Sequence, residues 1–174
     1  NWLGIENPSV LPGLSFGTYL LFQDAVLNAK FYAPLGLLFL GCAAWLFFRT
    51  LGCRATVCAI GGMAAALSSD TFSHACWGLP SRAFAQGSIF FALAALQSGL
   101  TRHRWVKVLL AGAAVGMAVM EAFDVGAIYS LLVAAYVIFL AWTRLPGGPG
   151  SRLAWGGVQL TLVAVFAAVL AAFA

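Results

Sequence analysis

Two groups of polar residues interrupt an otherwise apolar chain, and they include the residue types that acid–base chemistry needs. Asp70 and His74 are four residues apart and can form an acid–base pair, while Arg82 can bind a phosphate through two parallel hydrogen bonds. Glu121 and Asp124 are three residues apart, which places them on one face of a continuous helix. The catalytic candidates are Asp24, Asp70, Glu121 and Asp124, and the substrate-binding candidates are Lys30, His74, Trp77 and Arg82.

Each of these residues also has a structural interpretation, and both interpretations stay open. Asp124 can cap the helix that follows it, close to the positive end of the helix dipole. Trp77 can anchor the chain at a membrane interface, and Arg82 can extend its charged end from the first turn of a helix to water. Convergence of the whole set on one face of the protein would favour the functional interpretation.

The composition indicates a helical protein that crosses a membrane several times. Of 174 residues, 63% are hydrophobic and 8% are charged, whereas an average soluble domain has about 25% charged residues. This composition excludes a soluble globular domain, a disordered tail and a disulfide-rich mini-domain. The net charge of +4 comes from scattered residues, so it indicates membrane orientation and a lipid bilayer as partner rather than nucleic acid.

Hydropathy predicts an all-α membrane fold with about six transmembrane helices. A span needs about 20 residues, so the segments 55–67 and 106–120 are short and must borrow turns from their flanks. Residues 14–29 mix apolar and polar side chains, which predicts an N-terminal interfacial or re-entrant helix. The predicted spans are 31–48, 55–67, 83–100, 106–120, 125–142 and 153–174.

These segments form one transmembrane domain over 1–174. Its parts are an extracytoplasmic or interfacial segment over 1–30, a five-span core over 31–142, and a last span over 153–174 that follows a Pro/Gly-rich loop.

Charge patterning predicts the orientation. Three loops, 49–54, 101–107 and 143–152, hold seven of the nine Lys and Arg residues, so the positive-inside rule makes them cytoplasmic. All five acids then lie on the opposite side of a bacterial inner membrane, and both ends of the segment are extracytoplasmic. An extracytoplasmic start without a signal sequence predicts that the segment is part of a longer chain.

A helix break is predicted at 121–126. The 37 residues from Val106 to Trp142 would make one helix of roughly 55 Å at ~1.5 Å per residue, too long for the ~30 Å hydrocarbon core. Within this stretch, Gly112 and Gly116 form a G-x-x-x-G motif, which predicts close helix packing.

No motif identifies a metal site or a nucleotide site. The four cysteines have no metal-ligand spacing, and His103 lies in a basic loop on the side opposite His74. No metal-ligating residue is therefore assigned.

Three stretches together resemble a known family. They are Lys30–Leu35, which enters a span ending in Trp45–Arg49, the Cys76–Gly78 segment, and Ala111–Gly126, read as AGAAVGMAVMEAFDVG. The chain to about Trp142 looks like the middle of the YfhO-like bacterial membrane proteins, relatives of the GT-C glycosyltransferases.

This resemblance implies an enzyme that transfers a sugar from a polyprenyl-phosphate carrier at the extracytoplasmic face. It implies a polyprenyl-phosphate donor and a divalent cation as cofactors, with Arg82 or Lys30 offsetting the charge of the leaving phosphate. The key acid of GT-C enzymes usually lies in the first outer loop, which would fall mostly before Asn1, so the four carboxylates are candidates by position only.

Two other functions remain open. The chain can be a non-catalytic subunit or scaffold that packs against other membrane subunits or the rest of its own chain, in which case Phe72, His74 and Trp77 would be covered by a partner. It can also be a transporter in which a helix broken at 121–126 lines a site at mid-membrane depth.

Overall fold

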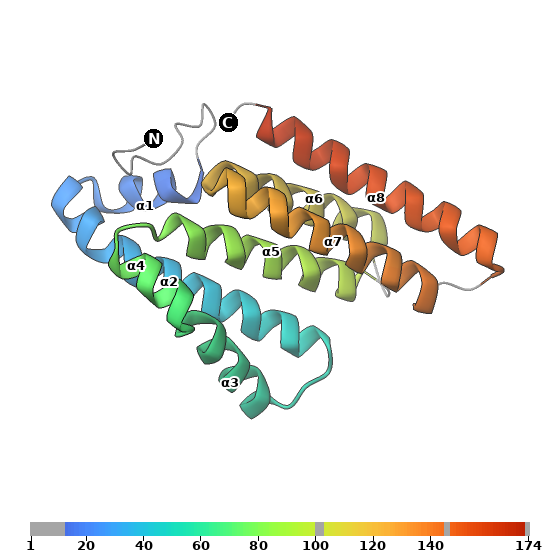
Figure 1. Ribbon diagram of the computed structural model, residues 1–174, viewed down its shortest axis with the longest axis horizontal. Coiled ribbons are helices and arrows are strands. Elements are labelled where there is room, and N and C mark those ends of the chain that lie inside the picture. The colour runs from blue at the N-terminus through green and yellow to red at the C-terminus, as the bar shows by residue number, and fades with distance from the viewer. Residues whose placement is uncertain (1–12, 100–102, 145–146, 173–174) are drawn as a thin grey trace.

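The computed structural model describes residues 13–99, 103–144 and 147–172, and in these ranges the chain forms eight helices and no strand (Figure 1). The all-α prediction is therefore confirmed for the described residues. The helices are α1 (Leu14–Phe22), α2 (Ala25–Thr50), α3 (Ala55–Ala66), α4 (Ser69–Cys76), α5 (Ser81–Ser98), α6 (Arg104–Glu121), α7 (Phe123–Arg144) and α8 (Pro149–Ala171).

Three helices are long and apolar enough to cross a membrane: α2, α7 and α8, with 26, 22 and 23 residues. The chain is thus a membrane protein by helix length and composition. The predicted span at 55–67 corresponds to α3, an apolar helix of only 12 residues. The predicted spans at 83–100 and 106–120 correspond to α5 and α6, which have 18 residues each.

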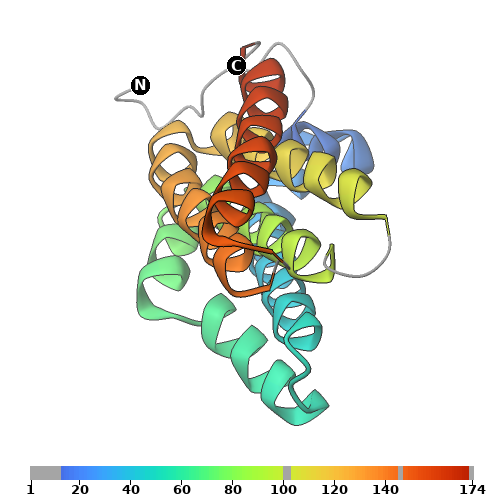
Figure 2. The same cartoon turned by 90° about the vertical axis from the view of Figure 1, so that its right-hand side faces the viewer.

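The core of the protein is built around α5. Eleven of its 18 residues are buried, and it packs against α2, α6 and α7. Figure 1 shows α5 between α2 on one side and the α6–α7 pair on the other. Many of its buried residues are small, which lets the neighbouring helices approach closely. By contrast, α3 lies at the margin of the bundle beside α2 in both views (Figure 2).

The predicted break between 121 and 126 is confirmed. Helix α6 ends at Glu121, Ala122 is extended with φ −150° and ψ 96°, and α7 begins at Phe123. Gly126 makes this sharp turn possible because a Cβ there would lie 2.6 Å from the carbonyl carbon and oxygen of Ala118. The break is a tight turn at one end of the bundle, after which α7 runs back alongside α6 (Figure 1).

The G-x-x-x-G motif packs two helices together, as predicted. A Cβ on Gly112 would lie 3.0 Å from the carbonyl oxygen of Val163, and one on Gly116 would lie 3.0 Å from that of Ala167. Both partners belong to α8, so the motif forms the α6–α8 contact.

The N-terminal segment differs from its prediction. One helix was expected over 14–29, but α1 ends at Phe22, and Gln23 adopts a left-handed conformation with φ 50°. The Asp24 carboxylate then accepts hydrogen bonds from the backbone amides of Val26 and Leu27, which starts α2 at Ala25. The boundary placed at 30/31 therefore falls inside α2, because the Asp24 cap starts the helix before its apolar run begins.

The segment from Asp70 to Arg82 lies between the predicted spans 55–67 and 83–100, where the sequence predicts a loop, but its first half is helical. Ser68 caps α4 through the backbone amide of Thr71, and Gly78, with φ 81°, helps turn the chain towards α5. Helices α3 and α4 together carry the chain back from the end of α2 to the start of α5 (Figure 1).

Acidic and most basic residues lie at opposite ends of the bundle. The acidic end carries the start of α2, α4, the start of α5 and the α6–α7 turn, and the basic end carries the opposite helix ends (Figure 1). Residues 1–12, Arg102 and residues 145–146 of the predicted loops lie outside the described ranges. Charged residues at the acidic end include Asp24, Asp70, Arg82, Glu121 and Asp124, and those at the basic end include Arg49, Arg54, Arg104, Arg144 and Arg152.

Candidate functional site at the acidic end

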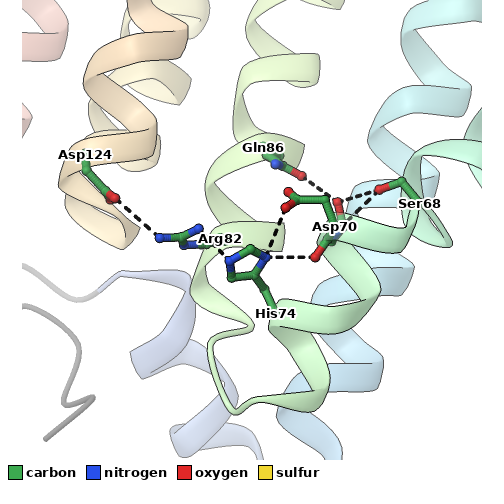
Figure 3. A network of polar contacts seen from close by, with 7 residues as sticks. Ser68, Asp70, His74, Arg82, Gln86 and Asp124 are labelled. Atoms are coloured by element: carbon green, nitrogen blue, oxygen red, sulfur yellow. Dashed lines mark hydrogen bonds and ion pairs between the residues drawn. The ribbon is translucent and has the colours of Figure 1, made fainter.

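Four of the candidate residues form one polar network across α4, α5 and α7, called here the acidic-end network (Figure 3). An Asp70 carboxylate oxygen lies 3.5 Å from His74 Nδ1, and His74 Nε2 lies 2.7 Å from Arg82 Nη1. Arg82 Nη2 in turn lies 3.5 Å from an Asp124 carboxylate oxygen. The structure thus brings together Asp70, His74, Arg82 and Asp124.

The hydrogen-bond partners of His74 indicate the role of each ring nitrogen. Nδ1 lies 2.8 Å from the backbone carbonyl oxygen of Asp70, which can only accept, so Nδ1 donates. The Arg82 guanidinium can only donate, so Nε2 accepts from it. Because its free lone pair is occupied, His74 acts here as a positioning residue for Arg82 rather than as a base.

The ion pair between Arg82 and Asp124 is exposed and therefore weak. Arg82 lies in the first turn of α5, its side chain is 35% exposed, and that of Asp124 is 68% exposed. An exposed ion pair of this kind contributes about 0–1 kcal/mol to stability. Asp124 also interacts favourably with the positive end of α7. The Arg82 guanidinium can therefore exchange Asp124 for another anion at little cost.

A cavity of about 280 Å³ lies beside the network, between α2, α4, α5 and α7. The Asp70 carboxylate, whose side chain is 75% exposed, borders it. Polar groups gather on part of the lining, and aliphatic and aromatic side chains form the rest. The lining residues include Ser68, Asp70, Thr71, Gln86 and Tyr129 on the polar part, and Leu40, Ile89 and Leu93 on the apolar part.

A chain of hydroxyl groups links α4 to α5 at this cavity (Figure 3). The Ser68 hydroxyl donates to Thr71 Oγ1 at 2.8 Å, and the Thr71 hydroxyl donates to Gln86 Oε1 at 3.1 Å. Sequence analysis missed these three residues and Tyr129. Gln86 carried a usable signal, because a polar amide within an apolar helix needs a partner.

Glu121 belongs to a different arrangement. It is only 6% exposed, and its carboxylate accepts from the backbone amide of Ser15 at 3.0 Å and from the Ser15 hydroxyl. The Ser15 hydroxyl also contacts the Tyr32 hydroxyl. Glu121 therefore ties the start of α1 to α6, with α2 alongside, which is a structural role.

The remaining candidates lie at the same end but outside the network. Asp24 caps α2, and Lys30 Nζ lies 5.7 Å from the ring centroid of Phe31. Trp77 is 76% exposed, and its ring centroid lies 6.0 Å from that of His74. Trp77 thus borders the network, whereas Asp24 and Lys30 make these contacts within α2.

The donor set does not fit a metal ion. Among the residues that the structure describes, no three His, Cys, Asp or Glu side chains gather closely enough to hold one. His103 lies at the start of α6, at the basic end.

Comparison with known proteins gives no match to a family model, a curated protein or a solved structure. The function must therefore be argued from the site.

Proposed function

We propose that the chain is a segment of a membrane-embedded, glycosyltransferase-like protein that acts on a polyprenyl-phosphate-linked sugar at the extracytoplasmic face. The observation that carries this proposal is the polar network that runs from a partly exposed arginine, Arg82, through His74 to Asp70, an exposed carboxylate that borders a cavity with polar and apolar walls. A lipid-linked sugar combines the same three features: a phosphate anion, hydroxyl groups and an apolar chain.

In this proposal Arg82 binds the phosphate of the donor. His74 holds one side of the guanidinium at 2.7 Å, so Arg82 keeps its place when a phosphate displaces Asp124. Charge-assisted hydrogen bonds from a guanidinium to phosphate oxygens are strong and directional. As the bond between the anomeric carbon and the phosphate oxygen breaks, the electron pair leaves with the phosphate, and Arg82 offsets the growing negative charge.

Asp70 is the candidate for the general base. Its carboxylate is exposed, borders the cavity and lies on the other side of His74 from Arg82. It would take the proton from an acceptor hydroxyl as that oxygen forms the new bond to the anomeric carbon. Asp124 is the partner of Arg82 in the absence of substrate.

We also propose six membrane crossings, with the acidic end extracytoplasmic in a bacterial inner membrane. Helices α5 and α6, of 18 residues each, would be about 27 Å long at ~1.5 Å per residue, close to the ~30 Å hydrocarbon core. Helix α3 alone would reach only about 18 Å, so α3 and α4 would complete one crossing together. The buried polar groups of α4 face α5 rather than lipid, which makes this crossing tolerable.

The test uses the protein in lipid nanodiscs with a polyprenyl phosphate that carries a radiolabelled hexose. We expect Arg82→Gln to weaken binding about tenfold or more, since a charge-assisted contact is lost. We expect Asp70→Asn to keep binding but to lower release of the labelled hexose about a hundredfold or more. Arg49→Gln, which removes an arginine from the basic end, is the matched control and should change neither quantity.

Equal binding by Arg82→Gln and the unchanged protein would contradict the proposal. The alternative would then be a non-catalytic subunit or scaffold, an interpretation favoured by the exposure of Phe72 and Trp77 in the isolated chain. The transporter interpretation has no comparable observation in its favour, because the break at Ala122 is a turn at the end of the bundle.

A further inference from the structure

The polar lining of the cavity includes an amide with unused hydrogen-bonding capacity. In the structure Gln86 Oε1 accepts a hydrogen bond from the Thr71 hydroxyl, and Nε2 is the other end of the amide. No hydrogen bond to Gln86 Nε2 occurs within the part of the chain that the structure describes, so its two N–H groups are available. Tyr129 lines the same cavity from α7, and its hydroxyl likewise makes no hydrogen bond to the described residues.

A second glutamine–tyrosine pair on the same two helices, Gln97 and Tyr136, is called here the closed pair because its two side chains hydrogen-bond to each other. The Tyr136 hydroxyl on α7 donates to Gln97 Oε1 on α5 at 2.8 Å. Gln86 and Tyr129 occupy the corresponding helices nearer the acidic end, where a cavity of about 280 Å³ separates the surrounding side chains. Gln97 and Tyr136 join α5 to α7 by a hydrogen bond, whereas Gln86 and Tyr129 line the cavity.

The charges around the cavity restrict what can occupy it. Asp70 is the acidic side chain among the residues that line it, and none of the described basic side chains lines it, so the lining disfavours an anion. The N–H groups of Gln86 and the hydroxyl groups of Thr71 and Tyr129 suit hydroxyl groups of a ligand. Ligand pockets for drug-sized molecules measure about 300–1,000 Å³, so this volume suits a single ring.

We propose that this cavity binds one uncharged, polyhydroxylated ring, and that Gln86 and Tyr129 determine its specificity. This inference rests on the proposed function and deepens it: the ring is the sugar of the lipid-linked substrate, while the phosphate lies at Arg82. Asp70 stands between the two sites, on α4 next to His74 and on the border of the cavity. An acceptor hydroxyl bound near the ring would therefore face a carboxylate.

The test measures binding of an alkyl glucoside with a photoreactive alkyl chain, in nanodiscs free of glycoside detergents. The alkyl alcohol with the same photoreactive chain is the sugar-free comparison. We expect the glucoside to crosslink to α4, α5 and α7 around the cavity, and the alcohol not to do so. Gln86→Leu and Tyr129→Phe should each weaken glucoside binding about three- to tenfold, as expected for one neutral hydrogen bond.

Matched control variants come from the closed pair. Gln97→Leu and Tyr136→Phe make the same chemical changes on the same two helices, so they should leave glucoside affinity unchanged. Because Gln86→Leu also removes the acceptor of Thr71, Gln86→Glu is a second variant that keeps an acceptor oxygen but removes both N–H donors. It should weaken glucoside binding as much as Gln86→Leu.

Three results would overturn the inference: equal crosslinking of glucoside and alcohol at the cavity, crosslinking of the glucoside elsewhere, or equal losses in the Gln86 and Gln97 variants. The proposed function fails separately, when Arg82→Gln leaves the affinity for polyprenyl phosphate unchanged. If the cavity binds glucoside but Arg82 does not bind phosphate, the inference about the cavity is supported and the proposed glycosyltransferase function is contradicted.

Discussion

Among single residues, the environment of each carboxylate decides what it can do. Glu121 is buried, and its oxygens are occupied by Ser15, so it stabilises the fold. Asp70 and Asp124 are largely exposed and flank His74 and Arg82. Acidic side chains at the same end of the bundle therefore differ in environment, because a buried carboxylate must have hydrogen-bond partners while an exposed one need not.

Replacing Glu121 should release α1. In Glu121→Ala the backbone amide of Ser15 loses its acceptor, and we expect the free energy of unfolding to fall by about 1–3 kcal/mol. Amide hydrogen exchange in 14–22 should become faster than in α5. Asp70→Asn, which alters an exposed carboxylate, should change the free energy of unfolding by less than about 0.5 kcal/mol. Equal protection of α1 in both variants would contradict this role for Glu121.

Replacing Asp124 should strengthen phosphate binding. Asp124→Asn removes the anion that competes for Arg82, so we expect the affinity for polyprenyl phosphate to rise severalfold, while Arg82→Gln lowers it. The pair is exposed, so the free energy of unfolding should change by no more than about 1 kcal/mol. Binding titrations in nanodiscs at two salt concentrations would measure this, and weaker binding by Asp124→Asn would refute the competition.

At the scale of helices, small residues decide which helices touch and where the chain turns. Gly112 and Gly116 allow α8 to lie against α6, and Gly126 allows α7 to fold back at once after Ala122. In a bilayer the helices gain little from burying apolar surface, so close van der Waals packing contributes much of the stability. A methyl group at such a contact should therefore be costly.

A glycine at a close backbone contact can be compared with a glycine that has open space around it. In Gly126→Ala the new Cβ would lie 2.6 Å from backbone atoms of Ala118, which cannot move aside, and we expect a loss of roughly 1–3 kcal/mol or more. Gly157 on α8 has no atom within 4 Å of the corresponding position, so Gly157→Ala should be neutral or stabilising by up to about 1 kcal/mol. Denaturation of both variants in mixed micelles would measure the difference, and similar values would contradict the tight turn.

Across the whole molecule, charge is distributed unequally between the two ends. The acids that the structure describes lie at one end, with Arg82 and Lys30, and the remaining described basic residues lie at or near the other (Figure 1). Translocation disfavours short loops rich in Lys and Arg, so this distribution favours one orientation in the membrane.

Cysteine labelling tests this orientation. Cys76 is exposed at the end of α4, and Cys53 lies in the turn between α2 and α3 at the basic end. In single-cysteine variants, a membrane-impermeant maleimide added to intact spheroplasts should label Cys76, and Cys53 only after permeabilisation. Labelling of both from one side would show that α3 and α4 together do not cross the membrane.

Local sequence patterns determined the parts of this protein that depend on neighbours along the chain. The apolar runs predicted the helical class, the length of the stretch from Val106 to Trp142 required a break, and the G-x-x-x-G spacing predicted a packing face. These features follow from helix geometry and transfer free energy, which each segment carries by itself.

Only the tertiary structure decided which polar groups meet. Ser68 caps α4, a helix in a segment where the sequence predicts a loop. This helix places His74 within hydrogen-bond distance of Arg82 on α5. The same folding placed Glu121 on Ser15, 106 residues away in sequence, rather than with Asp124, three residues away. Hydrogen-bond partners between helices depend on the rotation and axial offset of each helix against its neighbours, and no single segment of the sequence contains that information.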